Sequence, residues 1–412
     1  MQESYIQNLF AERIGGSKFG KDTVLYKFEK IKRARREVQE NRPDLSIIDM
    51  GVGEPDWMAD GIVVESLYIE ASKWKNRDYA DNGVEAFKQA AADYMDEVYD
   101  AELNWSTEIN HSIGSKPALA MLPMAFINPG DVCLMTVPGY PILGTMTSWL
   151  GGSVHKMPIT PENHFLPELS KVPADILQKA KLLYINYPNN PTGAVATREF
   201  FEQVIEFAKK NNIIVIQDAA YAALTFDDYE PLSFLSIPGA KDVGVEIHSL
   251  SKAFNMTGWR LGFVAGNEKI VKAFATVKDN NDSGQFKAVQ LAGCEALRHT
   301  EITEKTSAKY SRRHNMLVKV LCAAGFKAVK PKASFYIYCK APKGVKNGAS
   351  FANAEEFSQW LILEHGISTV PWDDAGNFVR FSVTYKADTE AAEIKIMEEI
   401  SSRLSQSEFV WE

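Results

Sequence analysis

The chain is poor in the residues that build metal centres and disulfide frameworks. Its 412 residues include only four cysteines and seven histidines. The cysteines are far apart in the sequence: Cys133, Cys294, Cys322 and Cys339. They form no CxxC pair, and no histidines have the spacing of a metal site. This pattern excludes a disulfide-rich secreted domain and a zinc module, and it predicts reduced thiols in the cytoplasm.

Long apolar runs and an excess of positive charge are also missing. The longest uncharged apolar run, residues 118–127, is about half of a membrane span and contains Pro123. From Glu3 onward the first residues are acidic and polar, unlike the basic start and apolar centre of a signal peptide. The net charge of -8 argues against a nucleic-acid binder. We therefore expect a cytoplasmic protein with no membrane anchor.

Short apolar runs alternate with longer amphipathic ones in the first two thirds of the chain, which is typical of a parallel sheet with crossover helices. The predicted strands are residues 46–50, 132–137, 182–186, 213–217, 245–248 and 261–265. One amphipathic helix is predicted over residues 197–212. These elements predict an α/β domain with a mostly parallel, doubly wound sheet over residues 46–285.

The remainder of the chain has a different pattern. A long helical stretch at residues 288–323 precedes strands at 334–339 and 378–384 and helices at 354–365 and 390–405. This order predicts a smaller α+β domain over residues 286–412. Residues 1–45 are expected to pack with this smaller domain or with a partner subunit.

Residues 249–260 contain a lysine between hydroxyl-bearing residues, followed by an arginine. Lys252 can form a Schiff base with the aldehyde of pyridoxal phosphate. Ser249, Ser251 and Arg260 offer donors for the cofactor's phosphate, and Gly258 allows the bend that returns Arg260 toward Lys252. A solvated turn is the alternative interpretation of these residues.

Polar residues follow the predicted strands, where an open α/β sheet binds its ligand. Asp218 ends one strand and could hold the pyridine nitrogen of the cofactor in its protonated form, although it could also cap the next helix. Tyr221 and Asn190 offer donors to the ring oxygen, and Asn190 lies in a turn-forming NNPTG segment.

Three further segments complete the predicted site. Gly114, Ser115 and Lys116 open an apolar helix whose first backbone N–H groups suit an anion. Tyr140 follows another strand end and could lie flat on the pyridine ring, or it could be a core aromatic between prolines. Arg380 lies in a C-terminal strand, where it could bind a substrate carboxylate bidentately or lie exposed at a sheet edge.

Taken together, these motifs resemble the fold-type I aminotransferases of class I/II over nearly the whole chain. The resemblance implies a pyridoxal-phosphate-dependent transaminase with a ping-pong reaction through Lys252. It implies that the backbone of Gly53 contacts the substrate carboxylate. It also implies that Tyr79 reaches the phosphate of the neighbouring subunit, in a homodimer with shared sites.

Within this family, residues 54–56, 280–285 and 370–374 resemble the LL-diaminopimelate aminotransferases. That branch transfers an amino group from glutamate to tetrahydrodipicolinate in lysine biosynthesis. The far end of such a substrate carries both an ammonium and a carboxylate, so its pocket needs acceptors and donors. Lys116 and Gln285 are candidates for the carboxylate, and Glu54 or Asp282 for the ammonium.

Other activities on the same scaffold remain open from the sequence. An aspartate or aromatic aminotransferase is the nearest alternative. No arginine lies between Arg260 and Arg298, where some aspartate enzymes supply one to the partner subunit. A carbon–sulfur lyase would share the cofactor site. A non-catalytic cofactor-binding domain is disfavoured because Lys252 and Arg380 are both present.

Overall fold

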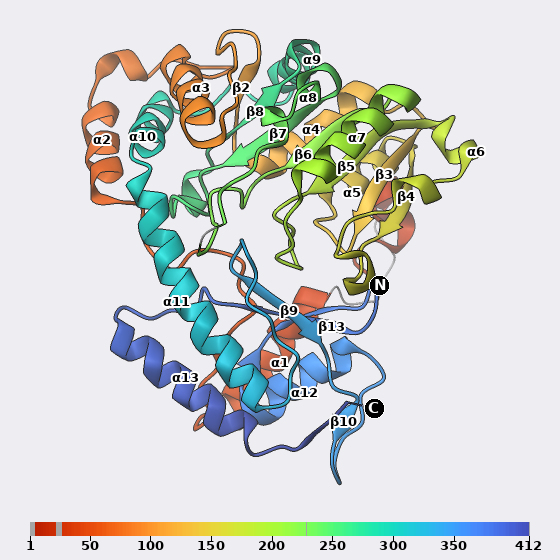
Figure 1. The fold of residues 1–412 in the computed structure, drawn as a ribbon, viewed down its shortest axis with the longest axis vertical. Coiled ribbons are helices and arrows are strands. Elements are labelled where there is room, and N and C mark those ends of the chain that lie inside the picture. Colours follow the sequence, from red (N-terminus) through yellow and green to blue (C-terminus); the bar gives the residue numbers. More distant parts are fainter. Residues whose placement is uncertain (1–4, 22–26, 228, 412) are drawn as a thin grey trace.

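Seven strands from the middle of the chain form one twisted sheet (Figure 1). The structure is a computed structural model that describes residues 5–21, 27–227 and 229–411. In spatial order the strands are β2 (Ile109–Ser112), β8 (Gly262–Gly266), β7 (Gly244–Ser249), β6 (Ile214–Asp218), β5 (Ala180–Asn186), β3 (Val132–Val137) and β4 (Ser153–Pro158). Within this sheet β8 runs in the direction opposite to the other six strands. The predicted α/β fold with a mostly parallel sheet is confirmed.

Helices cover both faces of this sheet because its central strands are apolar on both sides. Successive side chains of a strand point to opposite faces. Leu182 and Tyr184 of β5 accordingly pack with α4 (Ser115–Phe126), α5 (Ile142–Trp149) and α9 (Glu268–Asp279). Leu183 and Ile185 belong to the core on the opposite face. That second core includes residues of α3 (Glu85–Tyr99), α7 (Arg198–Asn211), α8 (Ala240–Val243) and α10 (Lys287–Arg298).

Helix α7 shows how local sequence sets the helix ends. The Thr197 hydroxyl accepts a hydrogen bond from the backbone N–H of Phe200 and caps the first turn. Asn212, with a φ of 56°, ends the helix in the left-handed conformation. The helix predicted over residues 197–212 is therefore confirmed with its caps.

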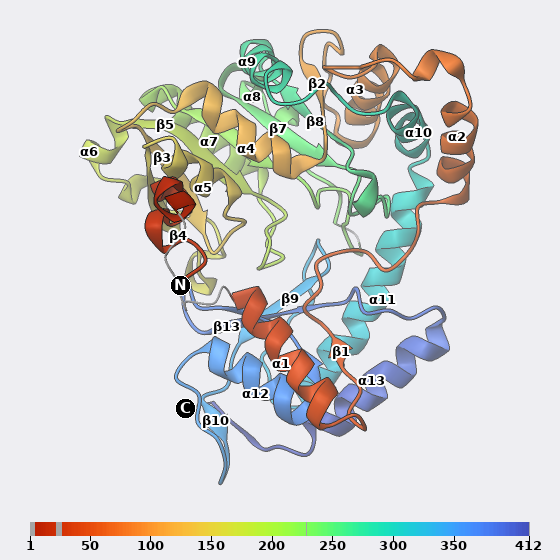
Figure 2. The same ribbon diagram turned by 180° about the vertical axis from the view of Figure 1, so that it is seen from behind.

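The C-terminal region forms a second layer below the large sheet (Figures 1 and 2). Its antiparallel sheet has the order β12 (Val370–Trp372), β13 (Phe378–Ser382) and β9 (Tyr336–Lys340). The helices α1 (Lys27–Asn41), α12 (Ala354–His365) and α13 (Glu390–Leu404) surround this sheet. Two short strands, β10 (Gly344–Val345) and β14 (Phe409–Val410), pair beside it. Helix α1 packs on α12, so part of the N-terminal segment lies with the smaller layer.

Two elements differ from the expectation. The predicted strand at residues 46–50 appears as β1 (Ile48–Asp49), but it pairs with β11 (Ile367–Ser368) outside the large sheet. The helical stretch predicted over 288–323 is divided at His299 and Thr300 into α10 and α11 (Glu301–Ala323). Helix α10 packs on α2 (Gly61–Ala71) and α3, whereas α11 crosses to the lower layer and packs on α13. The change of direction lets each helix bury its apolar face against a different layer.

A network of ion pairs joins Asp56, in the segment before α2, to helix α11. The carboxylate of Asp56 binds Lys309 at 2.5 Å and Arg313 at 3.0 Å, and Arg313 also binds Glu393 of α13 at 2.7 Å. All four side chains are at most 4% exposed. Within the described residues, no helix is long and apolar enough to cross a membrane.

Candidate active site

A cavity of about 320 Å³ is lined by residues of both layers, including residues at or just after the carboxyl ends of the parallel strands. Strand β2 runs in the same direction as β3, β5, β6 and β7, because β8 between β2 and β7 is antiparallel to both. The chain leaving each of these five strands can therefore reach the same edge. The cavity is lined by Gly53, Ser115, Lys116, Tyr140, Asn186, Asn190, Asp218, Ala220, Tyr221, Ser249, Ser251, Lys252, Thr257, Arg260, Tyr336 and Arg380.

Lys252 lies three residues beyond the end of β7. Its Nζ donates a hydrogen bond of 2.6 Å to the carbonyl oxygen of Gly53. Burial lowers the pKa of the Lys252 amine to about 8, and the positive charges of Arg380 and Arg260 act in the same direction. The lowered pKa increases the neutral fraction of the amine near neutral pH, and the neutral form is the one that attacks a carbonyl carbon.

Asp218 ends β6 at the floor of the cavity. Its carboxylate accepts hydrogen bonds of 3.2 Å from the backbone N–H of Ala220 and from the hydroxyl of Tyr184. Burial raises the pKa of Asp218 to about 6, and these two hydrogen bonds lower it in part. A buried carboxylate of this kind is stabilised by a cationic partner, which a protonated ring nitrogen would supply.

Arg260 and the start of α4 form an anion-binding corner. The guanidinium of Arg260 donates to the hydroxyl of Ser251 at 3.2 Å and to the carbonyl of Thr257 at 2.8 Å. Gly114 precedes α4, and a Cβ added to it would lie 2.2 Å from Nη2 of Arg260. The corner is therefore open only because residue 114 has no side chain, and it combines a guanidinium with the N-terminus of a helix.

Arg380 reaches the opposite side of the cavity from β13. It donates to Oδ1 of Asn190 and to the carbonyl oxygen of Gly51, both at 2.8 Å. Its guanidinium lies 4.0 Å from the ring centroid of Tyr336. Because Oδ1 of Asn190 accepts from Arg380, the amide Nδ2 of Asn190 can donate to a ligand.

Tyr336 belongs to the site but has no counterpart among the predicted residues. Its hydroxyl lies 3.0 Å from the hydroxyl of Tyr221, and a Cβ on Gly53 would approach it to 2.5 Å. Asn186 was also missed; it accepts a hydrogen bond of 2.9 Å from the backbone N–H of Asn190. Asn186 ends a predicted strand, so the rule used for Asp218 could have found it. Tyr336 begins a strand of the lower layer, and no motif in the sequence around it indicates a role in the site.

Some predicted site residues do not reach the cavity. The amide of Gln285 donates to the carbonyls of Trp259 and Arg260 at 2.8 Å and contacts His111 at 2.9 Å. Asp282 binds Lys278 at 2.6 Å. These contacts hold both side chains against neighbouring protein groups, and neither residue lines the cavity. Their assignment to substrate stays a prediction.

Glu54 and Tyr79 lie at the surface. Glu54 is exposed, close enough for its charge to raise the pKa of Lys252 in part. Tyr79 is 80% exposed and lines neither the cavity nor the cleft beside it. A role for Tyr79 at this subunit's own site is therefore not supported.

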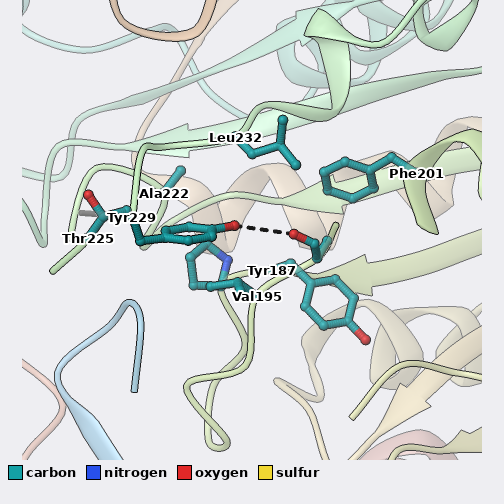
Figure 3. Close-up of a pocket in the computed structure, with 9 residues that line it drawn as sticks. Tyr187, Val195, Phe201, Ala222, Thr225, Tyr229 and Leu232 are labelled. Carbon is teal, nitrogen blue, oxygen red and sulfur yellow. Dashed lines mark hydrogen bonds between the residues drawn. The ribbon is translucent and has the colours of Figure 1, made fainter. Parts of the chain in front are cut away.

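A wider cleft of about 1070 Å³ adjoins the cavity and shares Lys116, Tyr140, Asn190 and Arg380 with it. A separate cavity of about 10 Å³ has Pro188 and Val195, from either side of the NNPTG segment, among its lining residues (Figure 3). There the hydroxyl of Tyr229 donates to the carbonyl of Ala196 at 3.2 Å. This space is about the size of one water molecule, and none of the predicted site residues lines it. In the described part of the chain, no group of histidine, cysteine and acidic residues could hold a metal ion.

Most of the chain matches the model of a known protein family. The family model described as aminotransferase class I and II matches residues 46–397. The chain is a class I and II aminotransferase. Enzymes of this class depend on pyridoxal phosphate. The family resemblance predicted from the sequence is confirmed.

Relatives of this aminotransferase include enzymes with a stated substrate. It is 59% identical to the LL-diaminopimelate aminotransferase of Methanococcus maripaludis, with 100% of both chains covered. It is 57% identical to the enzyme of the same name from Methanocaldococcus jannaschii, again over 100% of both chains. Among solved structures, substrate-bound BacF from Bacillus subtilis aligns with a TM-score of 0.86 and 30% identity, covering 100% of this chain and 99% of that chain.

Proposed function

We propose that this aminotransferase uses pyridoxal phosphate to exchange an amino group between glutamate and LL-diaminopimelate. The observation that carries the substrate assignment is the full-length identity of 59% and 57% to LL-diaminopimelate aminotransferases of two organisms. In the biosynthetic direction the amino acceptor would be tetrahydrodipicolinate, and the second product would be 2-oxoglutarate.

The cavity fits this cofactor at three points. Arg260, Ser249, Ser251 and the first N–H groups of α4 would hold a dianionic phosphate in the corner that Gly114 leaves open. Asp218 would pair with the protonated ring nitrogen, and this positive charge would stabilise its buried carboxylate. Tyr221 and Nδ2 of Asn190 would donate to the ring oxygen, and Tyr140 would cover one face of the ring.

Bound in this way, the cofactor supplies an electron sink for the electron pair left at Cα of the substrate. Lys252 would hold the cofactor aldehyde before substrate arrives. The free Nζ of Lys252 would act as the base that takes the proton from Cα of the substrate. Desolvation favours the role of Nζ as a base, because an amine with a pKa of about 8 exchanges protons readily near neutral pH.

Arg380 would set the orientation of the substrate. Its guanidinium is already held by Asn190 and Gly51 and lies over Tyr336, so little side-chain freedom remains to be lost on binding. A bidentate contact with the α-carboxylate, supported by the backbone of Gly53, would hold Cα near Lys252.

The proposal includes a homodimer. Several large apolar side chains are exposed on or near α2, including Val64 (46%), Tyr68 (78%) and Trp74 (75%). An apolar surface of this kind favours burial against another subunit. Tyr79, exposed close to this surface, would then contact the cofactor phosphate of the partner.

The test is a half-reaction with purified holoenzyme, followed by the absorbance of the bound cofactor. LL-diaminopimelate and glutamate, each added alone, should convert the cofactor to its amino form rapidly, whereas aspartate and phenylalanine should act at least tenfold more slowly. Lys252→Ala should abolish multiple turnover, and the matched surface variant Lys209→Ala should leave it unchanged. Faster conversion by aspartate or phenylalanine would keep the chemistry but reject the substrate.

A further inference from the structure

Arg260 holds its guanidinium at the anion-binding corner from a backbone conformation that arginine rarely adopts. Its φ of 58° and ψ of 55° lie in the left-handed region, where the Cβ crowds the following carbonyl oxygen. Residue 260 joins the short helix η8 (Thr257–Trp259) to β8, and this conformation sets the direction in which its side chain leaves the backbone. Such a conformation persists only where the surrounding structure holds it.

The side chain of Gln285 supplies two contacts that hold this conformation. Its amide Nε2 donates hydrogen bonds of 2.8 Å to the carbonyl oxygens of Trp259 and Arg260. An extended residue 260 would turn these two successive carbonyl groups apart, and one amide group could not bind both. The double contact therefore favours the left-handed conformation over the extended one.

His111 determines the orientation of the Gln285 amide. Its Nε2 lies 2.9 Å from Oε1 of Gln285, and an amide oxygen can only accept, so Nε2 is the donor. The imidazole is buried, and burial lowers the pKa of His111 to about 4. The ring is therefore neutral near neutral pH, with its one proton on Nε2. Among the described residues Nδ1 has no hydrogen-bond partner, which agrees with this tautomer.

The backbone around Gln285 is held as well. The carbonyl oxygen of Gln285 accepts a hydrogen bond of 2.8 Å from Nε2 of Gln290, whose Oε1 accepts one of 2.8 Å from the backbone N–H of Val84. The preceding residue, Gly284, donates its N–H to Asp282 at 2.7 Å. Because its backbone and its amide are both fixed, Gln285 can fix the backbone of Arg260 in turn.

We propose that Gln285, oriented by His111, is a positioning residue that holds Arg260 in the conformation needed to bind the phosphate of the cofactor. This inference rests on the proposed function, since it concerns the phosphate corner of the same site. Neither Gln285 nor His111 lines the cavity, so each acts through Arg260 and not by contact with cofactor or substrate. The effect should therefore concern ligands that carry a phosphate, and it should disappear when the guanidinium is removed.

The test measures the Kd of cofactor-free protein for pyridoxal phosphate and for pyridoxal, which lacks the phosphate. Both aldehydes can react with Lys252, so the ratio of the two Kd values isolates the contribution of the phosphate. Gln285→Met keeps the length of the side chain and removes the amide. His111→Phe removes the Nε2–H donor and keeps a ring beside Phe87. Gln203→Met, at an exposed position of α7, is the matched control.

Gln285→Met should raise the Kd for pyridoxal phosphate about 10- to 100-fold, the effect of losing one hydrogen bond to a charged group, and change the Kd for pyridoxal by less than about twofold. His111→Phe should raise the Kd for pyridoxal phosphate about 2- to 10-fold, because it frees the Gln285 amide without removing it. Gln203→Met should change neither value. In an Arg260→Ala background, Gln285→Met should raise the Kd for pyridoxal phosphate by less than about twofold.

An equal rise of both Kd values would mean a general loosening of the site and would overturn the proposal. An unchanged Kd for pyridoxal phosphate would also overturn it, and either variant can decide the question if the other does not fold. Gln285→Met protein that binds pyridoxal phosphate normally but loses kcat/KM for LL-diaminopimelate would assign Gln285 to the substrate instead. Wild-type protein that binds pyridoxal phosphate no more tightly than pyridoxal would contradict the proposed function itself.

Discussion

Replacing Gly114 with alanine should weaken cofactor binding through a direct clash with Arg260. The added Cβ would lie 2.2 Å from Nη2 and 2.9 Å from Cζ of the guanidinium. Ordinary contact requires about 3.5 Å, so the guanidinium must move by more than about 1 Å. The move would disturb its hydrogen bonds to Ser251 and Thr257 and displace it from the proposed phosphate site.

The loss can be estimated from the contact that is removed. One hydrogen bond to a charged group contributes about 1.5 to 3 kcal/mol, which corresponds to roughly a 10- to 150-fold increase in the Kd for pyridoxal phosphate. Gly114 also has a φ of 80°, which disfavours alanine and costs about 1 to 3 kcal/mol of folding stability. The two effects are separable, because the first concerns binding and the second concerns folding.

The assay is a titration of cofactor-free protein with pyridoxal phosphate, together with urea unfolding. Gly130→Ala is the control, since Gly130 has a φ of 91° and no atom within 4 Å of an added Cβ. It should lose stability but keep its cofactor affinity. In an Arg260→Ala background, Gly114→Ala should weaken binding little further. A Kd within about twofold of wild type for Gly114→Ala alone would refute the reasoning.

Three other predictions follow from buried charges. Asp218→Asn should lower the single-turnover rate with glutamate about 10²- to 10³-fold, and a near-normal rate would mean that the carboxylate has no electrostatic role. The rate of cofactor uptake by cofactor-free protein should rise between about pH 7 and 9 and then level off, because the Lys252 amine becomes neutral around its lowered pKa of about 8. A rate that continues to rise toward pH 10.5 would contradict this prediction. Asp56→Asn should lower the free energy of unfolding by about 3 to 5 kcal/mol, since it leaves Arg313 buried without one of its partners. In the same urea experiment, the control Asp242→Asn at an exposed ion pair should lower the free energy of unfolding by less than about 1 kcal/mol.

The local motifs were predictable because the residues that form each motif lie close together in the sequence. Lys252 and Arg260 are close in sequence, and Asp218 ends a strand of apolar residues. The rule that parallel strands end at one edge was enough to bring these segments together. Arg380 was expected on the same grounds of residue type and strand position, and the structure places it in the cavity.

The sequence was least informative where the surroundings of a residue depend on segments far away in the chain. Gln285 was expected to bind substrate, but the fold brings the carbonyls of Trp259 and Arg260 to its amide. The strand at residues 46–50 has the apolar pattern of a buried strand, and only tertiary pairing shows that its partner is β11. Tyr336 has no local motif and becomes part of the site through its contacts with Tyr221 and Arg380.

The sequence by itself therefore determined the fold class, the family and the residues suited to a pyridoxal-phosphate site, because hydrophobic period, turn chemistry and side-chain type are local properties. The tertiary structure decided which polar groups are committed to the protein, how burial moves the pKa of Lys252 and Asp218, and where the cleft lies. These properties depend on distance and desolvation, which arise only when segments far apart in the chain pack together.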